Sequence, residues 1–331
     1  MNWPTLPKGP SAVTKPGIIV FAYHDVGYAC LEALLRRGSR VLALFTHEDN
    51  PHETIWFKSV AQLARAQGIP VHTPDNVNTP EWIAHLRALQ PDIIFSFYYR
   101  HMIGQDILDL ARLGAFNLHG SLLPKYRGRV PINWAIIHGE TETGATLHYM
   151  VKKPDAGDIV DQEAVVIGAQ DTAQVVFPRV VQAARRVLER QIDAIEQGRP
   201  PRQPQDARQA SYFGGRRPED GRIDWRASAH AIFNLIRAVT HPYPGAYTEV
   251  DGRKLYIWWA QPQPDGGVTP GEVLSTRPLR IATGDGSLDI IDLQWQNEPE
   301  QAAVAGTHGL AAGQRLGVSP AAAVTTNNAT F

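Results

Sequence analysis

An asparagine and a histidine two positions apart are the first side chains in this sequence whose types suit catalysis. Residues 115–120 alternate apolar and polar side chains, which favours a short strand with Asn117 and His119 on one face. An amide donor beside an imidazole suits acyl transfer, in which negative charge grows on a carbonyl oxygen and a proton must move. Taken alone, however, such a pair is more often a structural histidine with an asparagine cap.

A carboxylate in a tight turn is the second candidate. Asp155 opens the run Asp-Ala-Gly-Asp-Ile, directly ahead of a predicted strand. Aspartate and glycine are common in turns, so this run alone is also more often structural. Residues 121–128, Ser-Leu-Leu-Pro-Lys-Tyr-Arg-Gly, form a connector between the two candidates, punctuated by proline and glycine. If the segments meet, Asp155 favours the cation of His119, because a carboxylate stabilises a neighbouring imidazolium.

Alternating strands and helices are predicted ahead of these residues. Apolar, β-favouring runs predict strands at 18–23, 41–45 and 92–99, and a short strand near Val71. Helices are expected before Gly38, over 57–67 and over 79–89. The run 92–99 is apolar on both faces, which is typical of the middle of a parallel sheet. We therefore expect an open α/β fold whose site lies at the carboxyl ends of its strands, just after Tyr99 and around Phe116.

The second half of the chain has a different pattern. A long helix is expected from Asp171-Thr172 to about Gln197, with Pro178 disturbing its start. Proline-rich residues 198–205 predict an interdomain linker. Short strands and one helix follow, at 222–225, 229–239 (the helix), 247–250, 254–259, 271–274, 279–282 and 288–293. This pattern predicts a small β-barrel, and the expected organisation is a leader (1–16), a catalytic domain (17–199), a linker (200–211), a barrel domain (212–310) and a tail (311–331).

The composition favours an ordinary two-domain globular protein. The chain has 331 residues, with 32 Lys+Arg against 33 Asp+Glu. It therefore lacks the excess of positive charge that is typical of proteins that bind nucleic acid. The single cysteine, Cys30, suits a reducing compartment, and we expect a cytoplasmic protein. No apolar run is long enough to span a bilayer, and the 12 histidines show no metal-ligand spacing with cysteines. We therefore expect neither membrane insertion nor a metal.

Taken together, three segments resemble the folate-dependent formyltransferase family in order and spacing. They are Phe-Asn-Leu-His-Gly at 116–120, the connector 121–128 and Asp-Ala-Gly-Asp-Ile at 155–159. The resemblance also covers 21–25, 95–101 and 241–247, and extends over about residues 17–310. It is strongest to the branch in the bifunctional polymyxin-resistance proteins, which formylates UDP-4-amino-4-deoxy-L-arabinose in lipid A modification.

The resemblance implies a fold, a reaction and a set of site residues. The fold is a Rossmann-like formyltransferase domain followed by a smaller OB-like β-barrel domain. The co-substrate is 10-formyltetrahydrofolate, the acceptor is a nucleotide-linked amino sugar, and the catalytic residues are Asn117, His119 and Asp155. The implied folate-binding residues are His101, Met102, Ile103, Arg129, Val151, Lys152, Lys153, Pro154 and Asp155.

One departure and several alternatives accompany this interpretation. In the bifunctional proteins a nicotinamide-dependent decarboxylase domain follows the formyltransferase. Here no strand with a glycine-rich phosphate turn appears after residue 310. We therefore expect the formyltransferase alone and leave the identity of the amino sugar open. Methionyl-tRNA formyltransferase shares the motifs and a barrel-like second domain, whereas glycinamide ribonucleotide formyltransferase usually lacks that domain. A silent folate- or nucleotide-binding module is the non-enzyme alternative, disfavoured by intact Asn117, His119 and Asp155. The expected partners are small molecules, without nucleic acid, and self-association as a homo-oligomer stays open.

Overall fold

The computed structural model describes residues 15–49, 51, 55–267, 269–303, 306 and 308–317. Apart from Lys15 and Pro16, the predicted leader lies outside the described residues, as does the predicted tail beyond Gly317. The described residues form two compact units that alternate along the chain. The first runs to His119 and includes Thr146–Glu163 and Ala184–Gln205. The second contains Gly120–Ala145, Ala164–Ala183 and the described residues from Asp206 onward.

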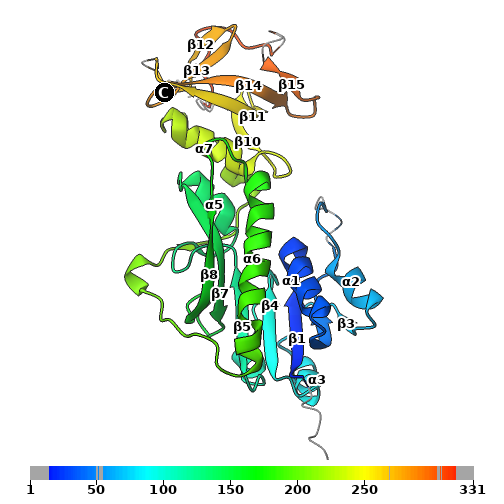
Figure 1. Cartoon of the computed structure of the whole chain (residues 1–331). Coiled ribbons are helices and arrows are strands. Elements are labelled where there is room, and N and C mark those ends of the chain that lie inside the picture. Colours follow the sequence, from blue (N-terminus) through cyan, green and yellow to red (C-terminus); the bar gives the residue numbers. More distant parts are fainter. Residues whose placement is uncertain are drawn as a thin grey trace, which may run out of the picture. The chain divides into compact units, whose positions relative to one another are not determined.

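A seven-stranded sheet in the order β3-β2-β1-β4-β5-β7-β8 is the framework of the amino-terminal half (Figure 1). Its strands are β1 (Gly17–Ala22), β2 (Arg40–Phe45), β3 (Val71–His72), β4 (Ile93–Phe97), β5 (Gly114–His119), β7 (Glu142–Tyr149) and β8 (Ile159–Val166). The pairs from β3 to β5 are parallel, whereas β5 and β7 are antiparallel. Chain order reverses between β1 and β4, and this switch point is where ligands commonly bind in open α/β sheets.

The helices of this half are α1 (His24–Arg36), α2 (Val60–Ala66), α3 (Pro80–Ala88), α4 (Gln105–Leu108) and α6 (Ala173–Glu196). Helix α2 begins three residues later than expected, because the Ser59 hydroxyl accepts a hydrogen bond from the Gln62 amide and caps it. Helix α6 contains Pro178 near its start, as the sequence predicted.

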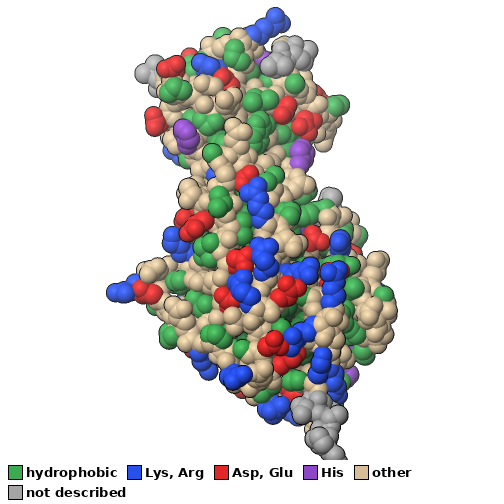
Figure 2. Space-filling model, in the orientation of Figure 1, with side chains coloured by type: hydrophobic (Ala, Val, Ile, Leu, Met, Phe, Trp, Pro, Cys, Tyr) green, Lys and Arg blue, Asp and Glu red, His purple; other side chains and the backbone are tan. Residues whose placement is uncertain are grey.

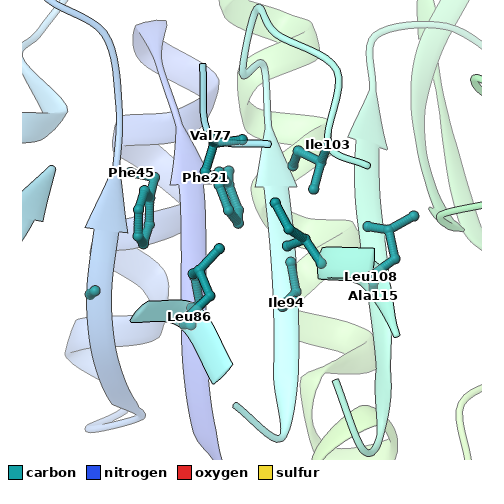
Figure 3. Close-up of a cluster of buried hydrophobic side chains, with 11 residues drawn as sticks. Phe21, Phe45, Val77, Leu86, Ile94, Ile103, Leu108 and Ala115 are labelled. Atoms are coloured by element: carbon teal, nitrogen blue, oxygen red, sulfur yellow. The ribbon is translucent and has the colours of Figure 1, made fainter. Parts of the chain in front are cut away.

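Strands β1 and β4 are buried at every position, which explains their continuous apolar sequences. One side of the sheet carries a cluster of buried side chains that includes Phe21, Phe45, Leu86 and Ile94 (Figure 3). Ile103 belongs to this cluster and Met150 packs against it. The cluster therefore anchors the backbone of two predicted folate-binding segments. Ile103 lies within the first segment, and Met150 directly precedes the second.

The second unit contains a six-stranded antiparallel sheet, in the order β10-β11-β14-β13-β12 with β15 against β14. These strands are β10 (Ala246–Val250), β11 (Arg253–Gln263), β12 (Val273–Thr276), β13 (Leu279–Ala282), β14 (Ser287–Trp295) and β15 (Gln301–Ala302). The unit also contains β6 (Arg127–Gly128), α5 (Pro131–Ile137), two short 3₁₀ helices (Ala207–Gln209 and Pro218–Gly221), β9 (Tyr212–Phe213) and α7 (Ala229–Val239). The expected fold class is confirmed: a mainly parallel α/β sheet precedes a smaller antiparallel β domain.

The expected strand at 222–225 is wrong. Arg222 makes only an isolated bridge to Tyr247. The chain then turns, because the Asp224 carboxylate accepts from the Arg226 amide and the Asp224 carbonyl accepts from the Ala227 amide. An apolar residue on each side of a turn-forming aspartate imitated the alternation of a strand.

Candidate active site

The structure brings Asn117, His119 and Asp155 together in the first unit. Asn117 and His119 lie near the carboxyl end of β5, and the antiparallel register places Asn117 opposite His148 of β7. Oδ1 of Asp155 lies 3.4 Å from the Asn117 amide nitrogen and 3.6 Å from Nδ1 of His119. The expected constellation is therefore present, although its catalytic role stays a prediction.

His148 is a fourth member that the sequence analysis missed. Its Nε2 lies 3.1 Å from the Asn117 amide nitrogen and 3.5 Å from Oδ1 of Asp155. Its Nδ1 lies 2.8 Å from the carbonyl oxygen of Tyr149. Because a carbonyl only accepts, Nδ1 carries a proton, and Nε2 of the neutral ring accepts from Asn117. The antiparallel pairing of β5 with β7 is the only signal that identifies this residue.

The carboxylate of Asp155 is largely withdrawn from water. Its side chain is 12% exposed, and those of His119 and His148 are 7% and 3% exposed. Burying a carboxylate is costly unless donors compensate, and here the Asn117 amide nitrogen and Nδ1 of His119 face Oδ1 of Asp155. The arrangement places the Asp155 carboxylate beside an imidazole that can carry and release a proton. It can therefore serve proton transfer during acyl transfer.

The turn that carries Asp155 is held by its backbone. Asp155 itself has φ 53°, a left-handed conformation uncommon outside glycine. A Cβ at Gly157 would lie 1.9 Å from the carbonyl oxygen of Tyr149, so only glycine permits this close approach. Gln205 donates from its side-chain amide to the carbonyl oxygens of Asp155 and Gly157, at 2.9 and 2.6 Å. Gln205 lies in the predicted linker, where nothing in the sequence marked it as a positioning residue.

The predicted folate-binding residues divide into several groups. His101 and Met102 are exposed after the carboxyl end of β4, and the side chain of Ile103 is buried in the core, so only its backbone is free to contact a ligand. Residues Val151–Pro154 are exposed ahead of Asp155. Arg129 belongs to the second unit, where its backbone amide donates to the Phe213 carbonyl.

The described residues contain no cluster of three or more His, Cys, Asp or Glu side chains suited to a metal ion. Within the same part of the chain, no helix is long and apolar enough to cross a membrane.

Fold and site thus define an α/β protein with a partly buried group of amide, imidazole and carboxylate side chains suited to acyl transfer. The formyl transferase family matches residues 18–192, and the C-terminal domain of formyl transferases matches residues 216–309. The chain belongs to the formyl transferase family, and it is an enzyme of that class.

Solved structures of similar fold include two sugar-modifying enzymes. One is an N-formyltransferase from Helicobacter canadensis in complex with folinic acid and dTDP-3-aminofucose, with a TM-score of 0.66 and 21% identity over 83% of this chain and 98% of that one. Another is WlaRD, a sugar 3N-formyl transferase in the presence of dTDP and 5-N-formyl-THF, with a TM-score of 0.64 and 21% identity over 86% and 100% of the two chains.

A third similar structure is HypX from Aquifex aeolicus, with a TM-score of 0.59 and 19% identity over 88% of this chain. This chain spans 47% of the length of HypX. At these identities the likeness concerns the fold.

Proposed function

We propose that this enzyme transfers the formyl group of 10-formyltetrahydrofolate to the amine of a nucleotide-linked amino sugar. The observation that carries the proposal is the convergence of Asn117, His119 and His148 on one oxygen of Asp155, in a chain of the formyl transferase family. The folate and the dTDP-sugar named with the similar structures support the two substrates. The domain boundaries at 17–199 and 212–310, with a linker at 200–211, belong to the same proposal.

The reaction forms a C–N bond between the acceptor amine and the formyl carbon, and it breaks the bond from that carbon to the folate nitrogen. One proton leaves the amine, and one proton is delivered to the folate nitrogen. His119 is the group we assign to proton delivery, because its imidazole is buried beside the Asp155 carboxylate, with Nδ1 3.6 Å from Oδ1. We assign Asp155 one of two roles. Either it accepts the proton that leaves the amine, or it keeps His119 in the form that donates a proton.

Asn117 is assigned to the oxygen that becomes negative in the tetrahedral intermediate. In this structure its amide nitrogen faces His148 and Asp155. A substrate oxygen therefore competes with these two acceptors for an amide proton. His148 restricts the orientation of the amide before the substrate arrives.

The folate-binding residues implied by the motifs belong to the same proposal. Exposed His101 and Met102 and the exposed segment Val151–Pro154 flank one hydrophobic cluster through Ile103 and Met150. We propose that the folate contacts both segments. Arg129 is proposed as a further folate contact from the motif alone.

The acceptor we propose is UDP-4-amino-4-deoxy-L-arabinose, in lipid A modification. The motifs at 21–25, 95–101 and 241–247 support this branch of the family. We also propose a cytoplasmic location. The single cysteine, Cys30, is buried and unpaired, which suits a reducing compartment. Methionyl-tRNA is the competing acceptor.

Surface charge favours the small acceptor over tRNA. Basic and acidic side chains lie next to each other along α6 on the face shown in Figure 2. Arg186 pairs with Glu163 there, and Arg190 pairs with Asp161. A paired surface with a net charge of −1 offers little counterion release to a polyanion, which agrees with a nucleotide-sugar acceptor.

The test is formyl transfer by the purified chain from 10-formyltetrahydrofolate to a panel of acceptors, with products detected by mass spectrometry. The panel contains UDP-4-amino-4-deoxy-L-arabinose, dTDP-linked 3- and 4-amino sugars, and initiator methionyl-tRNA. We expect the UDP sugar to be formylated with the highest kcat/KM, and His119→Ala and Asp155→Ala to lose turnover by orders of magnitude. His230→Ala, at an exposed position on α7, is the matched control. Efficient formylation of the tRNA alone would overturn the acceptor, and near-normal turnover in a folded His119→Ala variant would remove that residue from the mechanism.

A further inference from the structure

A polar cavity of the first unit lies at the carboxyl ends of β1 and β2, and none of its lining residues belongs to the Asn117 group. Its volume is about 260 Å³, and it opens beside the point where strand order reverses. Its lining includes aromatic rings, carboxylates and cations. The residues used below are Tyr23, His47, Glu48, Asp49, Phe57, Lys58 and Arg65.

The aromatic side of the cavity is held rigidly. The ring of Tyr23 lies edge-on to His47 and to Phe57, with centroids 5.3 and 5.0 Å apart. His47 stacks on Tyr99 and accepts a hydrogen bond at Nε2 from the Arg100 amide, 3.0 Å away. Burial, with His101 and Arg100 nearby, lowers the pKa of His47 to about 4, so the ring is neutral at physiological pH. A flat heterocycle finds neutral aromatic surface here, as nucleobases require for stacking.

The carboxylates follow directly after β2. Tyr23 donates from its hydroxyl to Oδ1 of Asp49 at 2.8 Å, and the Thr73 hydroxyl lies 3.4 Å from Oε1 of Glu48. Both side chains are therefore oriented by neighbours. In doubly wound sheets an acid at the end of the second strand characteristically accepts hydrogen bonds from ribose hydroxyls. Glu48 and Asp49 occupy this place in the fold.

Two cations complete the lining. Lys58 is oriented by its backbone amide, which donates to Asp25, and by its ammonium group above the Tyr28 ring. Arg65 lies on α2, and both side chains are exposed. Cations beside carboxylates and aromatic rings match a ligand that combines a base, a ribose and phosphates. The carboxylates disfavour a ligand made of carboxylates, such as the glutamate tail of a folate.

We propose that this cavity binds the ribonucleoside diphosphate part of the acceptor, with the base against Tyr23 and Phe57 and the ribose hydroxyls donating to Glu48 and Asp49. The inference rests on the proposed function and adds a place and a selectivity to it. Because both ribose hydroxyls are recognised by carboxylates, the site selects UDP over its 2′-deoxy counterpart and over dTDP.

The experiment is titration calorimetry of the full chain with UDP, dUDP and folinic acid, for the wild type, Glu48→Gln and Asp49→Asn. We expect each variant to bind UDP about tenfold more weakly, because a hydrogen bond to a charged acceptor is lost. The variant whose carboxylate accepts from the 2′-hydroxyl should also lose most of the preference for UDP over dUDP. Folinic acid affinity should stay unchanged. Asp251→Asn, in an exposed turn of the second unit, is the matched control.

The outcomes separate the cavity from the proposed function. Unchanged UDP affinity in both variants, with a UDP sugar still formylated by the wild type, overturns the cavity and leaves the function standing. A loss of folinic acid affinity in place of UDP affinity assigns the cavity to the folate and also overturns the inference. Failure of the wild type to formylate any nucleotide sugar overturns the proposed function, and the inference falls with it.

Discussion

Asn117 and His148 face each other across the antiparallel β5–β7 pair, with the Asn117 amide nitrogen 3.1 Å from Nε2 of His148. The Tyr149 carbonyl fixes the proton of His148 on the opposite nitrogen, so the imidazole presents an acceptor to the amide. The amide of Asn117 is thus oriented by a residue 31 positions later in the chain. Substitutions of Asn117 and of His148 should therefore both change catalysis.

Replacing Asn117 by alanine should lower kcat about 10²–10³-fold, the usual loss when a donor to a developing oxyanion is removed. The substrate KM values should change little, because the interaction strengthens only in the transition state. Steady-state formylation measures both parameters, and circular dichroism checks the fold. A variant that keeps wild-type kcat would show that Asn117 is structural.

Replacing His148 by phenylalanine should lower kcat about tenfold, because the ring keeps its volume but no longer accepts from Asn117. His148→Gln carries an amide oxygen that can accept and should recover part of the loss. His230→Phe, at an exposed position, is the control for ring substitution. Equal loss in the phenylalanine and glutamine variants would argue for a packing role alone.

Replacing Gly157 by alanine should reduce turnover and stability together. The added methyl group would lie 1.9 Å from the Tyr149 carbonyl oxygen, so the turn carrying Asp155 must move. Gly214→Ala is the matched control, because a Cβ there meets nothing within 4 Å. We expect the melting temperature and kcat to fall for Gly157→Ala and to stay near wild type for Gly214→Ala. A fully active Gly157→Ala enzyme would contradict the close approach of Gly157 to the Tyr149 carbonyl.

The stability of the protein should fall as pH drops from about 6.5 towards 4, partly through His47. Burial, with His101 and Arg100 nearby, lowers the pKa of His47 to about 4, whereas an unfolded histidine titrates near ~6.5. Between these values the unfolded chain binds more protons, so the contribution of His47 is full above about pH 6.5 and disappears as pH falls. Melting temperatures across this range should be flatter for His47→Gln than for the wild type and for His230→Gln. If the melting temperature changed equally with pH in all three proteins, His47 would be excluded as a source of the pH dependence.

Cys30 should be inert in the folded protein. It is fully buried on α1, and burial raises the pKa of its thiol well above the usual range. Ellman's reagent at pH 8 should detect no thiol in the native protein and one thiol per chain in guanidinium. Rapid reaction of the native protein would show that α1 opens or is packed differently.

The sequence by itself determined the central strands and the two kinds of sheet, and it placed Asn117 and His119 on one face of a strand. Strands β1 and β4 are buried on both faces, so their composition alone marks them, and spacing within β5 puts Asn117 and His119 on one face. These features depend on residues close together in the chain, where periodicity is informative.

Only the tertiary structure decided which distant residues complete the site. Strand β7 pairs antiparallel with β5, and this register brings His148 to Asn117. Gln205 reaches the Asp155 turn from a segment that reads as a proline-rich linker. Neither residue has a local signature, because a hydrogen-bond partner across a sheet or from a returning loop is set by where the whole chain packs. Glu48 and Asp49 likewise have no local signature, and only the fold places them in the lining of the cavity at the carboxyl ends of β1 and β2.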